Sequence, residues 1–551
     1  MNFNIFLNHQ TKTIGQAGVI LAVSALISRF LGITRDWLLA KSFGAGADLD
    51  IYFAAFKIPD LVYNILILGG VVVAFLPLFS EYFSKDPKEA WEFSSNCLNV
   101  FLTLLILLSF FLFIFTPLLV KLIAPGFDFE KMQKTIILTR IMFLSPIFFG
   151  LSSIFSGILQ HFNRFLVYSL CPILYNIGII FGILFLSPGL GIIGVALGVI
   201  LGAFMHFAIQ VPSALNCGFF YKPILDFRDS KIKRVFLLMI PRTFGVSASQ
   251  LNLVFINAIA STLSEGSISI FNFANNIQYF PIGIIGASFA MASFSALSRS
   301  WAKNEKEEFI HHFSLVFRQI LYLIIPVSIL IFILRNQIVE IILRHGQFSN
   351  QAALLTSASL GLFCIGIFAS SLILLFFRAF FALKDTKTPT LIAVISVALN
   401  IFLSFVFTQS LKPSATLKWQ KIMQALLVNV FSLKGINDIS VLGLSLATSV
   451  SVIFQFILLF IFLKKKIRDL KMKEIYNSFC KIFIGSILMI ITICFILVFI
   501  NSSLYPDFLK GAFWEILLVG LIGFLVYYFS TAFVLHSPET IAVKSLFIKN
   551  K

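Results

Sequence analysis

Charged residues are scarce in this chain, and acidic residues are the scarcest of them. Only 12% of the 551 residues are charged, with 24 Asp and Glu against 42 Lys and Arg, whereas 59% are hydrophobic. Soluble globular domains are about 25% charged, so this composition excludes a soluble fold for the chain as a whole. The sequence also lacks a P-loop, an HExxH motif and a GxSxG motif, and we expect no enzyme active site.

Cysteine and metal-ligand patterns are equally sparse. The six cysteines form no C-x-x-C pair and lie mostly within apolar runs, which is typical of small buried side chains rather than a disulfide framework. Asp48 and Asp50 are the acidic pair that a metal-dependent sugar-nucleotide enzyme would need, but no soluble catalytic domain accompanies them. We interpret them as loop residues and expect neither a metal nor a cofactor.

Long apolar runs dominate the sequence instead. Runs of about 20 apolar residues, enough for a helix to cross a bilayer, recur from end to end. We predict an all-α polytopic membrane protein with about fourteen transmembrane helices. They lie near residues 14–43, 50–83, 91–122, 133–161, 165–187, 190–216, 235–263, 266–299, 308–338, 352–383, 388–408, 438–463, 474–501 and 511–535.

Lysine and arginine collect in alternate connections between these runs. The basic connections lie near residues 222–234, 299–306, 384–387 and 464–473. Cytoplasmic loops are enriched in Lys and Arg, so we place these connections and both termini in the cytoplasm. The net charge of +18 is then a topology signal, and we do not expect nucleic-acid binding. The first apolar run is followed by no cleavage site, which predicts a retained span rather than a signal peptide.

An internal repeat divides the chain. Gly46 in FGAGADLDIYFAAF matches Gly266 in LSEGSISIFNFANN, and Gly126 in IAPGFDF matches Gly346 in ILRHGQF, both at a separation of 220 residues. Two such repeats predict parallel six-helix lobes around a central cavity. The predicted divisions are an N-terminal lobe at 1–217, a C-terminal lobe at 218–465 with an external insertion at 409–437, and two further helices with a cytoplasmic tail at 466–551. Helix-like spacing of apolar residues in the insertion predicts an amphipathic helix, either in the outer membrane interface or packed on neighbouring spans.

Charged side chains occur within the predicted spans. Arg29, Arg35 and Asp36 lie in the first span, and Asp36 returns to within about 20° of Arg29 around the helix. Charges at bilayer depth are costly and persist where they face protein, water or a partner, although Arg35 and Asp36 could instead end a helix at the interface. Lys57 follows in the second span and Arg242 in the seventh.

Amides add to these charges. Asn252, Asn257, Asn275, Asn276 and Gln278 lie in the seventh and eighth spans, where single amides usually bond neighbouring helices. The repeat places these spans near the first and second, so together the polar residues predict a cationic cavity suited to an anionic substrate. The expected substrate-binding residues are Arg29, Arg35, Asp36, Asp50, Lys57, Arg242, Asn275 and Asn276.

A series of segments resembles one known family. SRFLGITRD, FGAGADLDIYFAAFKIP, LIAPGF, GILQHFNRF, CPILYNIG and FFALKDTKTP occur in collinear order between about residues 14 and 465, and they resemble the MurJ (MviN) family of lipid II flippases. The resemblance implies two six-helix lobes, alternating access and a substrate made of undecaprenyl diphosphate linked to the peptidoglycan precursor. Arg29, Arg35 and Asp36 match the family's first-helix motif, and Asp50 and Lys57 match its second-helix motif.

The chain also departs from the family pattern. Tyr63 and Asn64 stand where the family has an arginine pair, and Asn275 and Asn276 stand where it has Asp-Arg. The family's acidic sodium ligands correspond to the neutral Asn257 and Ser404, so no sodium site is expected. Arg242 is expected either to replace one missing cation or to extend to the cytoplasmic headgroups.

These observations predict a monomeric lipid II flippase of a bacterial inner membrane. Its partners are lipid II, or a related lipid-linked glycan, and the bilayer. An exporter of another lipid-linked oligosaccharide or of a drug is the alternative among transporters. A membrane-embedded glycosyltransferase or a scaffold is the alternative outside that class.

Overall fold

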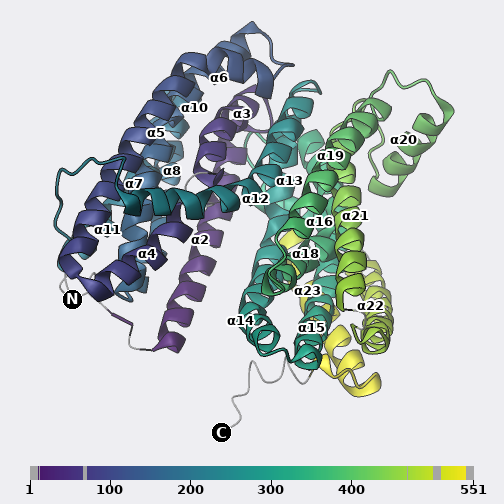
Figure 1. Cartoon of the computed structure of the whole chain (residues 1–551). Helices are drawn as coiled ribbons and strands as arrows, with labels where there is room; N and C mark the ends of the chain where they lie inside the picture. The colour runs from purple at the N-terminus through teal and green to yellow at the C-terminus, as the bar shows by residue number, and fades with distance from the viewer. Residues whose placement is uncertain (1–9, 12, 66–70, 468–469, 501–510, 541–551) are drawn as a thin grey trace. The chain divides into compact units, whose positions relative to one another are not determined.

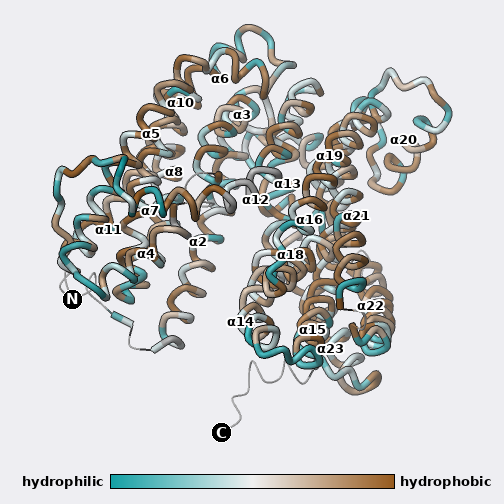
Figure 2. The backbone as a smooth tube through the Cα atoms, viewed as in Figure 1, coloured by the Kyte–Doolittle hydropathy of each residue, from teal (hydrophilic) through white to brown (hydrophobic). Residues whose placement is uncertain are grey.

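A computed structural model describes residues 10–11, 13–65, 71–467, 470–500 and 511–540, without the side chains at 14, 72–73, 241–242 and 244–248 (Figure 1). Within these residues every regular element is a helix. The chain forms two compact units, Met1–Ser269 and Ile270–Lys551. Hydrophobic residues follow the helices, and hydrophilic residues gather in the connections (Figure 2). The predicted helical class is therefore confirmed.

The first unit contains the predicted spans one to seven. Its helices are α2 (Ile14–Phe43), α3 (Ala47–Val62), α4 (Val72–Lys85), α5 (Pro87–Ile123), α6 (Phe129–Met142), α7 (Leu144–His161), α8 (Phe165–Phe181), α9 (Ser187–Leu190), α10 (Ile192–Ala208), α11 (Gln210–Asn216) and α12 (Ser230–Ser261). A π-helical turn, Gly182–Leu186, joins α8 to α9. The predicted second span is the pair α3 and α4, and residues 66–70 lie outside the described residues.

Acidic caps set where several of these helices begin. Asp86 accepts a hydrogen bond from the Lys88 amide at the start of α5, and Asp128 caps α6 and Asp229 caps α12 in the same way. Such caps satisfy amides that have no partner within the helix and stabilise it by about 1 kcal/mol each. The aromatic core of this unit lies between α4, α5 and α7, where Phe75 stacks on Phe93 and Phe79.

Helix α12 packs with the first unit, on α3, α4 and α5. Figure 1 shows its first part crossing α4 and α5. Ion pairs fasten this region to α5 and α4: Lys231 Nζ lies 2.7 Å from Glu89 Oε1, and Arg234 lies 2.9 Å from Glu81 Oε2. The predicted lobe boundary at 217/218, which rests on the repeat, remains a prediction.

The second unit contains the remaining predicted spans. Its helices are α13 (Ser267–Pro281, whose first residues belong to the first unit), α14 (Ser288–Ala302), α15 (Lys306–Ile333), α16 (Arg335–Ile342), α17 (Asn350–Cys364), α18 (Ile367–Ala382), α19 (Lys387–Ser410), α20 (Lys418–Phe431), α21 (Leu442–Ile467), α22 (Met472–Ile500) and α23 (Ala512–Phe529). π-Helical turns at Ile282–Ala287 and Ser530–Val534 follow α13 and α23. The predicted insertion helix is present as α20.

Polar contacts dock α23 and the residues after it on α15. The Tyr322 hydroxyl shares a 2.8 Å hydrogen bond with Thr531 Oγ1, and Tyr527 donates to the Tyr322 carbonyl at 2.8 Å. Near the basic end of the unit, Arg318 Nη1 lies 2.9 Å from Glu539 Oε1. Both α23 and the residues that follow it are therefore held to α15.

An ion pair joins two basic connections of this unit. Asp385, between α18 and α19, accepts from Lys466 Nζ at 2.8 Å and from the amide and hydroxyl of Thr388 at 3.0 and 2.8 Å. Partial burial opposes ionisation of this carboxyl group, but the hydrogen bonds from Lys466 and Thr388 outweigh it and lower the pKa of Asp385 to about 2. The carboxylate therefore stays charged and keeps the two connections together.

Eleven helices of the described chain are long and apolar enough to cross a membrane, or twelve when the pair Asn350–Cys364 and Ile367–Ala382, bent by 48°, is counted as one span. Among the fourteen predicted spans, the α3–α4 pair and α12 do not meet that measure. The fold class is confirmed, and the number fourteen remains a prediction.

Candidate functional site

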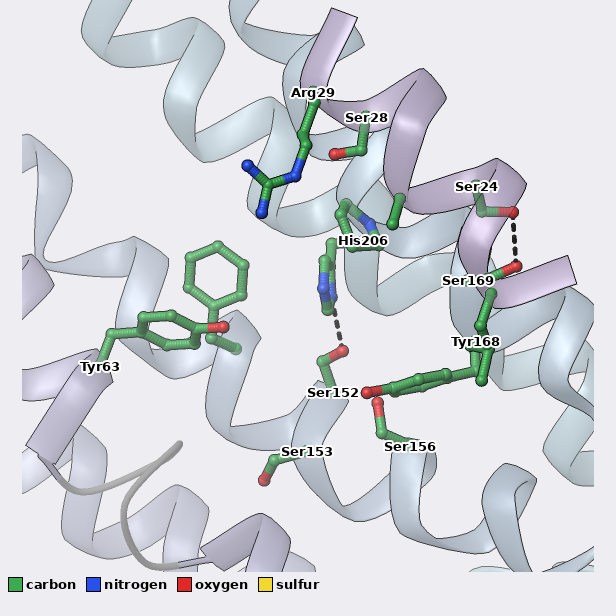
Figure 3. Close-up of a pocket in the computed structure, with 14 residues that line it drawn as sticks. Ser24, Ser28, Arg29, Tyr63, Ser152, Ser153, Ser156, Tyr168, Ser169 and His206 are labelled. Atoms are coloured by element: carbon green, nitrogen blue, oxygen red, sulfur yellow. Dashed lines mark hydrogen bonds between the residues drawn. The ribbon is translucent and has the colours of Figure 1, made fainter. Parts of the chain in front are cut away.

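A cavity of about 500 Å³ lies within the first unit, between α2, α7, α8 and α10. Tyr63, at the end of α3, also borders it. Figure 3 shows Arg29 and Ser28 extending into it from α2, with Tyr63, Ser152 and Ser153 on other walls. Ligand pockets generally have volumes of about 300–1,000 Å³, so the cavity is large enough for a small head group.

Serine hydroxyls form much of the cavity wall, and their protons are committed to the protein. Ser153 donates to the Gly150 carbonyl at 2.6 Å, Ser156 to Gln210 Oε1 at 2.9 Å, and Ser24 to Ser169 Oγ at 2.9 Å. A hydroxyl has one proton and two lone pairs. These serines therefore have lone pairs left to accept hydrogen bonds from a ligand.

His206 joins this network through Ser152. Gln210 Nε2 donates to Ser152 Oγ and to the His206 carbonyl, and Ser152 shares a 2.7 Å hydrogen bond with His206 Nδ1. Gln210 and Ser152 thus connect His206 on α10 to the serines of α7 in one hydrogen-bond network. Aromatic rings complete the wall, where Tyr63 and Phe149 have ring centroids 4.5 Å apart.

The predicted first-helix charges separate into two groups. Arg29 lines the cavity, whereas Arg35 forms an ion pair with its neighbour, its Nη2 and Nε lying 2.8 and 3.0 Å from Asp36 Oδ1. Arg35 Nη1 also donates to Asn176 Oδ1 at 3.3 Å, and Asn176 Nδ2 donates to Ser28. Asp36, which α2 places on the same face as Arg29, thus pairs with its neighbour Arg35.

Lys57 and Asp60 lie one turn apart on α3, with Pro59 between them inside the helix. Opposite charges at this spacing lie on one face and attract each other. Asp60 Oδ1 also accepts from Asn64 Nδ2 at 2.9 Å. Asn64, one of the two residues at the family's arginine positions, thus faces back along its own helix.

Asp50 does not line the cavity and instead takes part in a contact between α3 and the start of α13. Its buried carboxylate accepts from the amides of Gly266 and Ser269 at 2.7 and 2.9 Å, and from the Ser269 hydroxyl at 2.6 Å. In return, Glu265 Oε1 accepts from the Ala47 amide at 3.2 Å at the start of α3. Each carboxylate thus sits at the positive N-terminal end of the other segment's helix.

We call this set, Ala47, Asp50, Glu265, Gly266 and Ser269, the α3–α13 contact. Lys131 on α6 reinforces it with Nζ 2.6 Å from Glu265 Oε2. Backbones also meet there: Gly266 has a φ of +86°, and a Cβ on it would overlap the Ala45 carbonyl. Gly266, one member of the glycine repeat found in the sequence, therefore marks a close backbone approach.

The remaining predicted residues lie elsewhere. Asn275 and Asn276 are on α13 in the second unit, where Asn275 Oδ1 accepts from Gln278 Nε2 at 2.9 Å. Arg242 belongs to α12, but its side chain lies outside the described residues. Asn257, also on α12, donates to the Ile123 carbonyl at 2.8 Å. Within the described chain, no three His, Cys, Asp or Glu side chains gather as a metal site would require.

The sequence interpretation missed the hydroxyl wall. Ser152, Ser153 and Ser156 lie within five residues of an otherwise apolar span, and this density of hydroxyls was the available signal. Tyr63 was noted only as a departure from the family pattern, yet it borders the cavity.

Membrane-length helices around a cavity that Arg29 and several serines line define a helical membrane transporter. A family model described as lipid II flippase MurJ matches residues 39–415. The chain belongs to this family, as the resemblance implied.

Individual proteins agree with this assignment. The chain is 32% identical to the probable lipid II flippase MurJ of Buchnera aphidicola subsp. Schizaphis graminum, over 71% of the chain and 78% of that protein. It is 27% identical to the lipid II flippase MurJ of Burkholderia cenocepacia, over 70% of the chain and 77% of that protein.

Solved structures show the same fold. A lipid II flippase MurJ in an inward closed conformation matches with a TM-score of 0.74 and 26% identity, covering 96% of this chain and 98% of that one. An inward-facing MATE family transporter of the MOP superfamily matches with a TM-score of 0.66 at 14% identity, covering 83% and 99%. The second likeness concerns the fold alone.

Proposed function

We propose that this protein moves lipid II across the bacterial inner membrane by alternating access, as a monomer and without catalysing a reaction. The family match over residues 39–415 carries the proposal. Both termini are cytoplasmic in this proposal, because the connections near 222–234, 299–306, 384–387 and 464–473 hold the basic residues.

The cavity supports recognition of the polar head group. The lone pairs of Ser153 and Ser156 suit the hydroxyl and amide donors of a sugar-peptide, while Arg29 suits a diphosphate or carboxylate. Charge-assisted hydrogen bonds contribute about 1.5–3 kcal/mol each. Loss of Arg29 should therefore weaken head-group binding by roughly ten- to a hundredfold.

The other predicted residues take different parts in this proposal. Arg35 and Asp36 fix α2 against α8 through Asn176, and so hold Arg29 in register. Lys57 on α3 is a second cation for the substrate. We also propose polar contacts with the substrate from Arg242 on α12 and from Asn275 and Asn276 on α13. Of these three, Arg242 is expected to contribute most because it is charged.

Asp50 is proposed to act in closure rather than in binding. In the proposed orientation, the connection between α2 and α3 is external, and the α3–α13 contact seals that side. Alternating access requires such a seal to open and reform. Hydrogen bonds at helix ends are suited to this, since water can replace them once they separate.

The substrate itself is tested by depletion. In the bacterium that makes this protein, depletion should cause lipid II to accumulate on the inner leaflet, and the wild-type gene should reverse this. Arg29→Ala should fail to restore transport at normal membrane abundance. Arg140→Ala is the matched control, because Arg140 lies on α6 over the Phe113 ring and outside the cavity lining.

The neutral Tyr63 and Asn64 favour the second candidate, an exporter of another lipid-linked glycan, because the family resemblance implies arginines at these two positions. Accumulation of a different lipid-linked glycan with normal lipid II distribution would select that candidate. Accumulation of neither would contradict transport of this substrate class.

A further inference from the structure

Helix α20 (Lys418–Phe431) lies outside the family match, which ends at residue 415. It interrupts the connection between α19 and α21, at the ends of these helices opposite the basic connections near 384–387 and 464–473. Figure 1 shows it standing beside the ends of α19 and α21. The family match therefore gives no role for α20, and its role is inferred from its own side chains and their contacts.

One face of α20 packs on its own unit. Leu427 and Phe431 are each 5% exposed, and Phe431 lies against the guanidinium of Arg335, 5.1 Å from the ring centroid. Gln424 Nε2 donates to the carbonyls of Ser410 and Lys412, at 3.1 and 2.8 Å. These contacts fix the orientation of the helix about its axis.

A second apolar face points away from the unit. Trp419, Ile422, Leu426 and Val430 are 48%, 59%, 56% and 51% exposed. Their spacing of three, four and four residues places them in one stripe along the helix. An amphipathic helix with one packed face and a second exposed apolar stripe needs a further apolar environment.

Exposed lysines border this stripe. Lys418 and Lys421 lie on α20 and Lys434 follows it, while the acidic residue in residues 411–440 is Asp438, which is engaged with the Ser440 amide. The segment is therefore cationic, and its charge complements an anionic surface. Lysines beside an apolar stripe are typical of helices that lie in a membrane interface.

We propose that α20 docks on the bilayer that surrounds the protein. Trp419, Ile422, Leu426 and Val430 enter the boundary between head groups and acyl chains, and the lysines contact anionic phospholipid head groups. With the proposed orientation this is the outer leaflet. A second copy of the chain is a poorer occupant, because two-fold pairing would bring the same lysines together and one 14-residue helix offers less than the ~800 Å² per partner of a stable interface.

Docking would anchor the connection between α19 and α21 at a fixed depth. Gln424 transmits this constraint directly, since it holds the end of α19 through the Ser410 carbonyl. The proposal does not depend on which lipid-linked substrate is moved, and its test contains no transport measurement.

The test uses the full-length protein, with its six free cysteines replaced, in lipid nanodiscs that contain phosphatidylglycerol. Nitroxide labels are attached at Ile422→Cys in the stripe and at Ala425→Cys, an exposed position of α20 about 60° around the helix from Ile422, on the side away from the stripe. Collision with oxygen reports the apolar phase, and collision with a water-soluble nickel chelate reports water. The ratio of oxygen to nickel accessibility should be severalfold higher at 422 than at 425.

The lysines provide the second arm. In anionic nanodiscs, Lys418→Gln and Lys421→Gln should each lower the ratio of docked to undocked α20 about fivefold. The reason is that one basic residue near an anionic membrane surface favours binding to it by about that factor. Equal nickel accessibility at 422 and 425 would overturn the proposal. Dipolar broadening between labels at 422 would overturn it in favour of a second copy, and unchanged docking after both lysine changes would overturn the head-group contact.

Discussion

Asp50→Ala is the perturbation with the largest expected effect on the α3–α13 contact. The change removes a buried acceptor from the amides of Gly266 and Ser269 and from the Ser269 hydroxyl. Leaving a buried donor without a partner costs about 1–3 kcal/mol, and loss of a carboxylate at a helix N-terminus costs about 0.3–1 kcal/mol more. Water admitted by the smaller side chain offsets part of this, so we expect the closed contact to weaken by about 3 kcal/mol, or roughly a hundredfold in population.

The reporter is Ser267→Cys, because Ser267 follows Gly266 of the contact in sequence and is 1% exposed. In a background without the native cysteines, its alkylation by an impermeant maleimide should be slow and should accelerate by up to about a hundredfold with Asp50→Ala. Asp48→Ala is the matched control, since Asp48 is an exposed carboxylate in the same first turn of α3. An unchanged alkylation rate with Asp50→Ala would refute the closure argument, as would equal acceleration by Asp48→Ala.

Three further outcomes are expected. Asp36→Asn should lower the free energy of unfolding by about 3 kcal/mol because it leaves Arg35 without its ion pair, and Arg35→Gln in the same protein should recover part of the loss in a thermal-melting assay. The pKa of Asp385 is about 2, below its ordinary 3.8, so its stabilisation is complete above the ordinary value and is lost only as pH falls through about 2. Asp385→Asn should therefore lower the melting temperature equally at about pH 6 and about pH 8, and a difference between the two would contradict the assignment. Ser414→Cys should react with an impermeant reagent from outside and Ile467→Cys should not, whereas the reverse pattern would invert the proposed orientation.

Much of the fold could be predicted because apolar length and charge placement act locally. The spans of α5, α8 and α10 follow from runs that only a helix can bury in lipid. The α3–α4 pair and α12 were also predicted as spans, but within the described residues they do not reach the length and hydropathy of a membrane-crossing helix. Helix α12 is held by ion pairs such as Lys231–Glu89, which join residues far apart in the sequence.

The site was predicted less completely, and the reason is chemical. A charged residue in an apolar run is conspicuous, so Arg29 and Arg35 were found, but sequence cannot show that Arg35 turns to Asp36 while Arg29 lines the cavity. Hydroxyls are inconspicuous, because a serine within a span often satisfies itself on the preceding turn. Ser153 does bond to its own helix, and it still presents lone pairs to the cavity.

The repeat shows how a sequence signal can carry a second, steric meaning. Two glycine pairs separated by 220 residues predict parallel lobes around a central cavity, and this remains a prediction. One glycine of each pair also lies where two backbones meet, because a Cβ at Gly126 would overlap the Ser261 carbonyl and one at Gly266 would overlap that of Ala45. A side chain at either position would therefore push the neighbouring backbone away. In the proposed mechanism these close approaches belong to the seal, while Arg29 and the serines of α7 recognise the substrate.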